Sequence, residues 1–513
     1  MWVLVAAIVA SSMAFIDSTV VNVALPALQT SFGASVVSVQ WVVESYGLTL
    51  AALILMGGSM GDLFGRRRMF VLGIAVFAIA SMVCGLASSI KELIVARAVQ
   101  GIGAAFLVPG SLALISASFD ERERGRAIGT WSGSTAITTA IGPVLGGWLI
   151  EHFSWRWAFF LNLPLAVAVI AMSLWRVPES RSGQHKQVDW MGVVIATLSL
   201  SGLVFGFIES SSLGWTHPAV FISLVLGAIG SIAFLFVEAA AVAPMVPLDI
   251  FRSEIFSGGN LLTLFLYAAI GTFFFLFPLD LIQVQGYSPA TAGAAVLPFI
   301  LLMFLLSRWS GSLVDRYGAR LPLTIGPLIV AFGFLLLSIP SVGNSYWVAF
   351  FPAMVLLGLG MAVVVAPLTT IVMDAVKPDR LGTASGVNNA VARVAGLLGI
   401  AVLGGVMVSE FAGQLQWRLA ASAIPAPERS ELQSNATRMA ALKPPAGTDS
   451  RIAAAIGSAV TASFVSGFRI IMWICAALAL VSAAITLRMI PARSSRRMAH
   501  SLSAGQSRAG VRT

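Results

Sequence analysis

The chain has 513 residues, of which 58% are hydrophobic and only 10% are charged, and its formal net charge is +9. An ordinary soluble domain carries about 25% charged residues, so this composition excludes a soluble globular protein and indicates an integral membrane protein. The basic excess does not indicate a nucleic-acid partner, because Lys and Arg concentrate in short segments beside apolar runs, where they reflect membrane topology.

Fourteen apolar runs are long enough to cross a bilayer, for which a helix needs roughly 20 residues. We therefore predict an all-α polytopic membrane protein with about 14 transmembrane helices. The predicted spans are residues 3–25, 39–60, 69–87, 93–116, 127–150, 157–175, 190–207, 219–237, 256–284, 290–313, 321–339, 347–373, 384–408 and 462–489. The connections after the even-numbered spans carry fourteen Lys and Arg residues, and the opposite connections carry seven. This excess predicts that both termini are cytoplasmic, in a plasma membrane or a bacterial inner membrane.

A polar segment recurs 253 residues along the chain and indicates two structural halves. Gly58, Asp62, Gly65 and Arg67 each match a residue of the same type in the segment that begins at Gly311. Six spans precede and six follow the seventh and eighth spans, so we predict two six-helix bundles of the same orientation with an inserted helix pair. The predicted parts are an N-terminal bundle at 1–176, the inserted pair with its flanking connections at 177–254, a C-terminal bundle at 255–489 with a long external loop at 409–461, and a disordered basic cytoplasmic tail at 490–513.

Several charged residues lie inside predicted spans, where each costs at least roughly 2.5–3.5 kcal/mol near the membrane centre, and three of them are the clearest candidates. At about 1.5 Å per residue, Asp17, Glu44 and Arg97 all fall roughly 6 to 9 Å below the outer face of the bilayer. Two acids and a guanidinium at one level can pair and share a proton, which predicts a proton-coupling site. Two alternatives are that Arg97 is a structural ion-pair partner, or that Glu44 and Arg97 extend to the nearby surface.

Two further charges are candidates for a substrate site or a second-half charge site. Asp280 lies near the outer end of the ninth span, and Arg393 lies near mid-depth in the thirteenth. For Asp280, a side chain that simply reaches interfacial water is the alternative.

The repeated cytoplasmic loops are the candidate gating elements. Short hairpins need turn-permissive glycines, and arginines anchor at anionic headgroups. A carboxylate beside arginines at the membrane edge also suggests an ion pair that breaks when this side opens, although a purely topological anchor is the alternative. The candidate gating residues are Gly58, Asp62, Gly65, Arg66, Arg67, Asp315, Arg316 and Gly318.

The fifth span contains a run of small residues around one proline. Gly133, Gly142, Gly146 and Gly147 allow a neighbouring helix to approach closely, and Pro143 removes one helical hydrogen bond. Such a helix between two moving halves is a mechanical element, and ordinary close packing is the alternative.

Five stretches in order resemble the major facilitator superfamily and, within it, the drug:proton antiporters with fourteen spanning helices. They are IDSTVVNVALP at 16–26, GSMGDLFGRRR at 58–68, RAVQG at 97–101, the glycines from 133 to 147 with their proline, and SWRW at 154–157 followed by Asn162 and Pro164. The second half has Ile400 where Pro143 would repeat, so the antiporter pattern belongs to the first half only.

This resemblance implies a multidrug efflux transporter that works by alternating access, with substrate bound between the halves near the midplane. We expect proton-coupled export of small amphipathic or drug-like compounds by a monomer that needs no cofactor and no metal, because the proton gradient drives it. The expected partners are the substrate, protons and the lipid bilayer. The alternatives are an exporter of one metabolite, lipid or siderophore, a facilitated uniporter and, least favoured, a polytopic membrane enzyme or sensor.

Overall fold

The computed structural model describes residues 1–181, 189–241, 244–377, 380–422, 424–445 and 447–492, except for the side chains of residues 121, 122, 136 and 308. Its helices are α1 (Trp2–Phe32), α2 (Val36–Phe64), α3 (Arg66–Leu86), α4 (Ile90–Ser118), α5 (Glu121–His152), α6 (Trp157–Phe160), α7 (Asn162–Arg176), α8 (Trp190–Leu213), α9 (Pro218–Ala240), η1 (Leu248–Arg252), α10 (Glu254–Leu279), η2 (Asp280–Val284), α11 (Pro289–Ala294), α12 (Leu297–Tyr317), α13 (Arg320–Leu337), α14 (Tyr346–Ala349), α15 (Phe351–Asp374), α16 (Leu381–Ala420), α17 (Ala426–Ser434), η4 (Ala436–Ala441) and α18 (Ser450–Met489).

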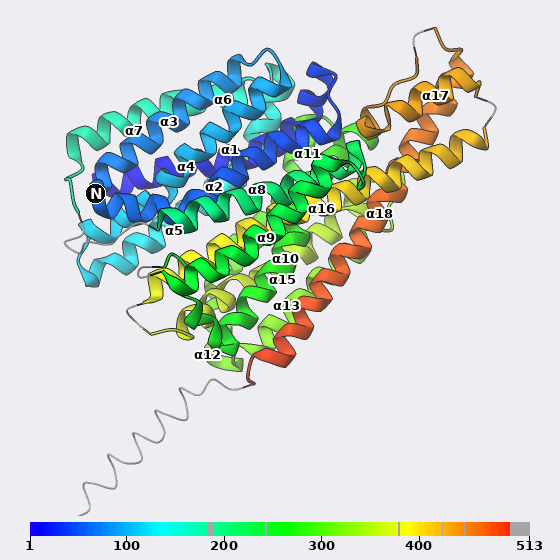
Figure 1. Cartoon of the computed structure of the whole chain (residues 1–513). Helices are drawn as coiled ribbons and strands as arrows, with labels where there is room; N and C mark the ends of the chain where they lie inside the picture. Colours follow the sequence, from blue (N-terminus) through cyan, green and yellow to red (C-terminus); the bar gives the residue numbers. More distant parts are fainter. Residues whose placement is uncertain (182–188, 242–243, 378–379, 423, 446, 493–513) are drawn as a thin grey trace, which may run out of the picture.

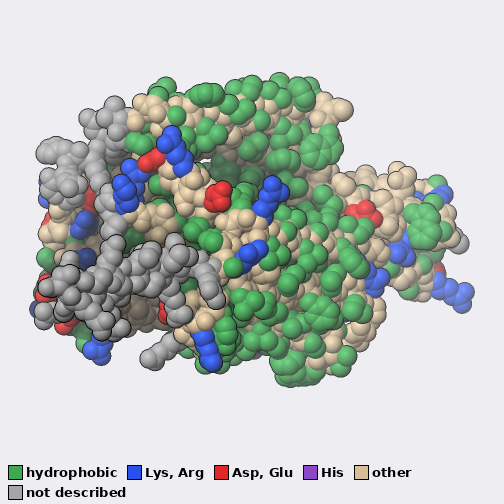
Figure 2. Space-filling view, turned by 90° about the horizontal axis from the view of Figure 1, so that it is seen from below, with side chains coloured by type: hydrophobic (Ala, Val, Ile, Leu, Met, Phe, Trp, Pro, Cys, Tyr) green, Lys and Arg blue, Asp and Glu red, His purple; other side chains and the backbone are tan. Residues whose placement is uncertain are grey.

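Within these residues, fourteen helical stretches are long and apolar enough to cross a membrane. Each overlaps one predicted span, which confirms the all-α polytopic architecture. Hydrophobic side chains cover most of the central part of the face in Figure 2, as expected for a surface that lies in lipid.

Serines in the short polar connections start several of these helices. The hydroxyl groups of Ser35, Ser89, Ser253 and Ser288 each accept a hydrogen bond from the backbone N–H three residues later. A serine at this position satisfies one of the backbone donors that a first helical turn leaves free. The polar punctuation between the apolar runs therefore also sets where the helices begin.

Two helical bundles lie side by side (Figure 1). In the first, α2 and α3 pack on α4, and α1 packs on α5. In the second, α10 packs on α16 and α18, while α13 packs on α15 and α18. Between them in the sequence, α8 and α9 form a hairpin, and α8 packs against both α2 and α16. The hairpin therefore covers one seam between the two bundles.

The segment 409–461, predicted as a long external loop, is mostly helical, and that part of the prediction was wrong. Helix α16 continues to Ala420, α17 and η4 follow, and α18 begins at Ser450. These helices are rich in Ala and polar residues, so they lack the apolar period by which a spanning helix is recognised. We call the segment from α17 to η4 the outer cap. Most of the predicted tail at 490–513, and residues 182–188 of the insertion, lie outside the described residues.

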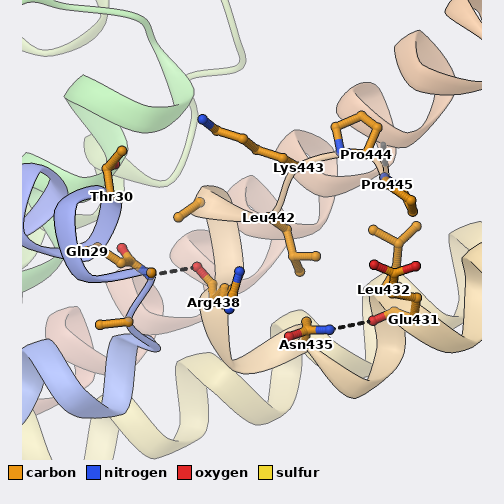
Figure 3. Close-up of a pocket in the computed structure, with 13 residues that line it drawn as sticks. Gln29, Thr30, Glu431, Leu432, Asn435, Arg438, Leu442, Lys443, Pro444 and Pro445 are labelled. Carbon is orange, nitrogen blue, oxygen red and sulfur yellow. Dashed lines mark hydrogen bonds between the residues drawn. The ribbon is translucent and has the colours of Figure 1, made fainter. Parts of the chain in front are cut away.

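Hydrogen bonds join the two bundles at the end that carries the outer cap, which we call the outer end. Gln29 Nε2 donates to the Arg438 carbonyl over 2.8 Å (Figure 3). Gln29 Oε1 also accepts from Gln283 Nε2 over 2.9 Å. The backbone N–H of Ala290 donates to Glu151 Oε2 over 3.1 Å. The outer end is therefore closed in this structure.

Candidate functional site

A buried ion pair joins the first and fourth helices. Arg97 Nη1 of α4 donates to Asp17 Oδ2 of α1 over 2.5 Å, and the two side chains are 1% and 0% exposed. Removing two charges from water costs several kcal/mol for each ion, and only close pairing with further hydrogen bonds offsets this. The structure thus brings together two of the three charged residues that the sequence places at one depth.

Three uncharged polar side chains complete the network. Gln100 lies one helical turn after Arg97, donates to Asp17 Oδ1 over 2.8 Å and accepts from Arg97 Nη1 over 2.7 Å. Asn162 Nδ2 of α7 lies 3.3 Å from Asp17 Oδ1 and donates to Ser81 Oγ of α3 over 3.0 Å. Four helices therefore contribute to one occluded polar site.

Aromatic side chains hold the guanidinium from its other sides. The Arg97 Cζ atom lies 4.2 Å from the centroid of the Tyr46 ring and 5.8 Å from that of Phe159. Arg97 Nε also donates to the Val42 carbonyl over 3.2 Å. Cation–π contacts are strongest where water is excluded. Arg97 can therefore stay in place through contacts that do not depend on the charge of Asp17.

Glu44 does not join this network. Its side chain is fully buried in α2, and neither carboxyl oxygen has a hydrogen-bond partner among the described residues. A buried, unpaired carboxylate is costly, so the neutral acid is the form that suits this position. The predicted sharing of a proton between Asp17 and Glu44 is not visible in this conformation.

The glycines of α5 face two different helices. A Cβ atom at Gly142 would lie 2.1 Å from Thr19 Oγ1, and one at Gly146 would lie 2.6 Å from Val20 Cγ1, so this face packs directly on α1. A Cβ at Gly147 would lie 2.2 Å from the Pro289 carbonyl oxygen at the start of α11. The neighbouring face of α5 therefore meets the second bundle.

The two remaining members of the predicted motif, Pro143 and Gly133, differ from each other in their surroundings. Pro143 also meets α11, because a Cβ at Gly293 would lie 2.0 Å from the Pro143 carbonyl oxygen. Gly133, in contrast, has open space where its Cβ would lie. In this structure the close packing is confined to the outer part of α5.

The first of the two repeated loops, predicted to be cytoplasmic, forms contacts within its own bundle and with the chain that follows it. Asp62 pairs with Arg66 over 2.7 Å, one helical turn away. Gly65 has φ +112°, a conformation that side chains rarely adopt, and the backbone N–H of Arg67 donates to Glu179 Oε1 over 3.0 Å. Glu179, which the sequence did not single out, thus ties this loop to the chain that follows α7. Gly58 lies beside Pro109 of α4.

The second-half copy of this loop also turns at a glycine. Gly318 ends α12 with φ +78°, and the Arg316 guanidinium lies 5.3 Å from the Tyr317 ring. Asp315 also makes an interaction. The two copies share the glycine turn and an arginine that donates to a backbone carbonyl, Arg67 to Val177 and Arg320 to Leu487.

The two remaining candidates lie apart from Asp17. Asp280 is 2% exposed and starts the π-helical turn η2 at the outer end of α10. Arg393 of α16 is half-buried and lies within electrostatic range of Tyr46. In the part of the chain that the structure describes, no three His, Cys, Asp or Glu side chains could hold a metal ion.

A family model described as Major Facilitator Superfamily matches residues 7–400. A multidrug resistance protein, Stp, of Mycobacterium tuberculosis is 36% identical over 410 residues, covering 79% of this chain and 75% of that protein. A tetracenomycin C resistance and export protein of Streptomyces glaucescens is 33% identical, covering 94% and 90%. A puromycin resistance protein, pur8, of Streptomyces alboniger is 35% identical, covering 81% and 83%.

Solved structures share the architecture at low sequence identity. A bacterial homolog to the human lysosomal transporter Spinster superposes with a TM-score of 0.64 at 17% identity, covering 96% of this chain and 98% of that chain. A D-xylose-proton symporter gives 0.63 at 14% identity, with the same coverage of both chains. These two likenesses show the fold.

Proposed function

Because the chain belongs to the Major Facilitator Superfamily, and is therefore a transporter and not an enzyme, we propose that it exports amphipathic, drug-like compounds across a cell membrane in exchange for protons. Export is supported by the relatives, whose names describe resistance to antibiotics or their export. Exchange for protons is supported by the buried pair of Asp17 and Arg97, which is the observation that carries the proposal.

Protonation of Asp17 would break this pair. A charged Asp17 needs Arg97 beside it, whereas a neutral carboxylic acid needs only a hydrogen bond, so binding a proton competes with the ion pair. Arg97 keeps its contacts with Gln100 and the Val42 carbonyl when the pair opens. The charge state of Asp17 therefore controls how firmly α1 is held against α4.

Helix α5 is placed to transmit a movement of α1 to the second bundle. One of its faces packs on α1 at Thr19 and Val20, within one turn of Asp17. Its other face packs on α11 of the second bundle through Gly147 and Pro143. Backbones in such close contact have no flexible side chains between them to absorb a shift. Opening of the Asp17 pair is therefore linked to the contact that closes the outer end.

We also propose a membrane topology, which rests on the distribution of Lys and Arg. The excess of Lys and Arg in alternate connections supports cytoplasmic termini and an outer cap on the external side. The protein would work as a monomer in a plasma membrane or bacterial inner membrane, driven by the proton gradient without a cofactor. The same site could export one metabolite, lipid or siderophore, since nothing in the ion pair selects the substrate.

A facilitated uniporter is the second candidate function, and one experiment separates it from an antiporter. Everted membrane vesicles that contain the protein are supplied with an amphipathic dye and then with a proton gradient. We expect the gradient to drive dye into the vesicles against its concentration. Equilibration at the same rate with and without the gradient would instead establish a uniporter.

The Gln29 side chain should stabilise the closed outer end. It forms two hydrogen bonds across the seam, each worth about 0.5–1.5 kcal/mol. Gln29→Ala is therefore expected to shift the equilibrium toward the open outer end by about 5- to 150-fold. The measurement is the rate at which a membrane-impermeant maleimide labels an Ala290→Cys reporter, with low background because Cys84 and Cys475 are fully buried.

Thr30→Ala is the matched control for this experiment. Thr30 and Gln29 both line a pocket beneath the outer cap (Figure 3). The Thr30 hydroxyl, however, donates to the Pro26 carbonyl of its own helix. Its removal should leave the labelling rate unchanged. Equal rates for Gln29→Ala and Thr30→Ala would show that the Gln29 contacts do not hold the outer end closed.

A further inference from the structure

A cavity of about 720 Å³ lies between the inserted hairpin and the two bundles. Its walls come from α2, α8, α9, α10, α16, η1 and the chain just before η1. Ligand pockets commonly enclose about 300–1,000 Å³, so this space is large enough for a drug-sized molecule. We call it the hairpin cavity.

The hairpin cavity lies in the cytoplasmic half of the membrane, on the topology proposed above. Its walls use residues 196–203 of α8, 231–235 of α9 and 257–264 of α10. At about 1.5 Å per residue, these positions lie within roughly 20 Å of the cytoplasmic helix ends, in a bilayer core about 30 Å thick. The space therefore reaches from the inner leaflet to about the midplane.

In the outer half of the membrane, α8 packs directly on both bundles. Val204 and Ile208 of α8 are fully buried in one apolar cluster with Leu397 and Ala401 of α16. Glu209 of α8 also accepts a hydrogen bond from Trp41 Nε1 of α2 over 2.8 Å. The hairpin is thus attached to both bundles on the outer side. Near its cytoplasmic end, Val193 of α8 packs on Met56 of α2 and Phe106 of α4, so the cavity lies between these two regions of contact.

The cytoplasmic end of the cavity is covered by the chain that leads into α10. Val246, Leu248 and Phe251 line the cavity from this segment. An ion pair of Asp249 with Arg380 ties the segment to the start of α16, and the hydrogen bond from Arg380 lowers the pKa of Asp249 below its ordinary value. Asp249 therefore stays charged near neutral pH and is available to pair with Arg380.

The side toward the lipid is open by comparison. Leu235 of α9 and Leu261 of α10 line the cavity, and they are 51% and 38% exposed. In a membrane, such exposed leucines meet the acyl chains of the inner leaflet. A molecule dissolved in that leaflet could reach the cavity without passing through the cytoplasm.

The wall of the cavity farthest from the lipid lies at the seam between the bundles and carries a polar side chain. Asn260 of α10 lines it, is 4% exposed, and accepts a hydrogen bond from Asn388 Nδ2 of α16 over 3.2 Å. Ala51 of α2 and Ala390 of α16 bring the first and second bundles together at the same wall. Apolar walls with the Asn260 amide at the seam match a molecule with an apolar body and a polar group.

We propose that the hairpin cavity is a lateral access site, where the inserted hairpin takes up amphipathic substrate from the inner leaflet and delivers it to the space between the bundles. This inference rests on the proposed export function and assigns the hairpin a role in it. A phospholipid acyl chain that stays in the cavity as a structural filler would suit the apolar walls, but it would make no use of the Asn260 amide at the seam.

The experiment fills the cavity in the full-length protein in proteoliposomes. Ala196→Trp places an indole at a lining position of α8, and Leu198→Trp is the matched control because Leu198 is 66% exposed on the same helix. Two cationic dyes serve as probes: trimethylammonium-diphenylhexatriene, which partitions into the bilayer, and ethidium, which is water-soluble. We expect Ala196→Trp to reduce export of the first dye by about tenfold or more, because the indole displaces apolar contact, and to change ethidium export little.

The other outcomes each decide against a part of the proposal. Equal loss of both dyes would make the cavity a structural element only. Unchanged export of both dyes by Ala196→Trp, with normal wild-type export, would exclude lateral access while leaving the export function intact. A phospholipid that copurifies with the wild type and is lost from Ala196→Trp, without dye selectivity, would identify the structural filler. Wild-type protein that exports neither dye under a proton gradient would remove the export function and the lateral site together.

Discussion

Asp17→Asn is expected to abolish proton-driven export while leaving substrate binding largely intact. The amide keeps the shape of the carboxyl group, but it cannot release a proton and offers no charge to Arg97. A gradient of one pH unit supplies about 1.4 kcal/mol per proton, enough for a roughly tenfold substrate ratio across the membrane. Wild-type proteoliposomes under such a gradient should approach this ratio, whereas the ratio for Asp17→Asn should stay near one.

Substrate binding is measured first, because the variant leaves a buried cation without its anion. Removing one partner of a buried ion pair costs about 3–5 kcal/mol in general. Arg97 retains Gln100, the Val42 carbonyl and the Tyr46 ring, so we expect the variant to fold and bind. A binding-competent Asp17→Asn that still builds a substrate gradient would contradict the coupling role and leave Asp17 with a structural one.

Glu44→Gln is the companion variant. Glu44 is as deeply buried as Asp17, yet its carboxyl oxygens have no partner within the described part of the chain. Because a neutral acid and an amide are similar in size and polarity, we expect a mild effect on the substrate ratio. A severe loss would instead indicate that Asp17 and Glu44 titrate together.

The spans and the depth of the charges could be predicted from the sequence, because both depend on distances along single helices. A fixed rise per residue is enough to place Asp17 and Arg97 at one level. Which polar groups meet there depends also on how each helix is rotated about its axis. Gln100 was within reach of such reasoning, since it follows Arg97 by one turn of the same helix. Ser81 and Asn162 were not, because their contacts depend on the packing of α3 and α7.

Glu44 also shows that depth alone does not decide which side chains meet, since the sequence predicted a contact here that the structure does not contain. Its depth matches that of Asp17, but its side chain leaves α2 in a direction that does not reach Arg97, while Tyr46, two residues later, does. The hairpin cavity could not be predicted either, since it is lined by five α-helices and η1, whose approach is set by side-chain packing. Only the existence of the inserted pair followed from the repeat.

The glycines of α5 left two interpretations from the sequence, a mechanical element and ordinary packing. The structure adds which neighbour each glycine meets. Gly142 and Gly146 face α1 within its own bundle, and Gly147 faces the backbone of α11 in the other bundle. A contact between bundles must form and separate during alternating access, so Gly147 is where the two interpretations can be told apart.

Gly147→Leu is therefore expected to reduce export to background by preventing closure of the outer end. Its Cβ would lie 2.2 Å from the Pro289 carbonyl oxygen and 2.8 Å from Ala290 Cα, and backbone atoms cannot rotate away as a side chain can. Overpacking typically costs about 1–3 kcal/mol, so the closed state should lose about 5- to 150-fold in population. Faster maleimide labelling of the Ala290→Cys reporter measures that shift, alongside dye export from everted vesicles.

Gly133→Leu is the matched control, because it makes the same substitution on the same helix where the added Cβ meets nothing within 4 Å. Both variants gain the same helix propensity, about 1 kcal/mol for replacing a glycine, so any difference between them comes from the contact with α11. Gly133→Leu should label at the wild-type rate. If Gly147→Leu also labels and exports as the wild type does, the two bundles do not need this close contact, and the glycines of α5 serve packing alone.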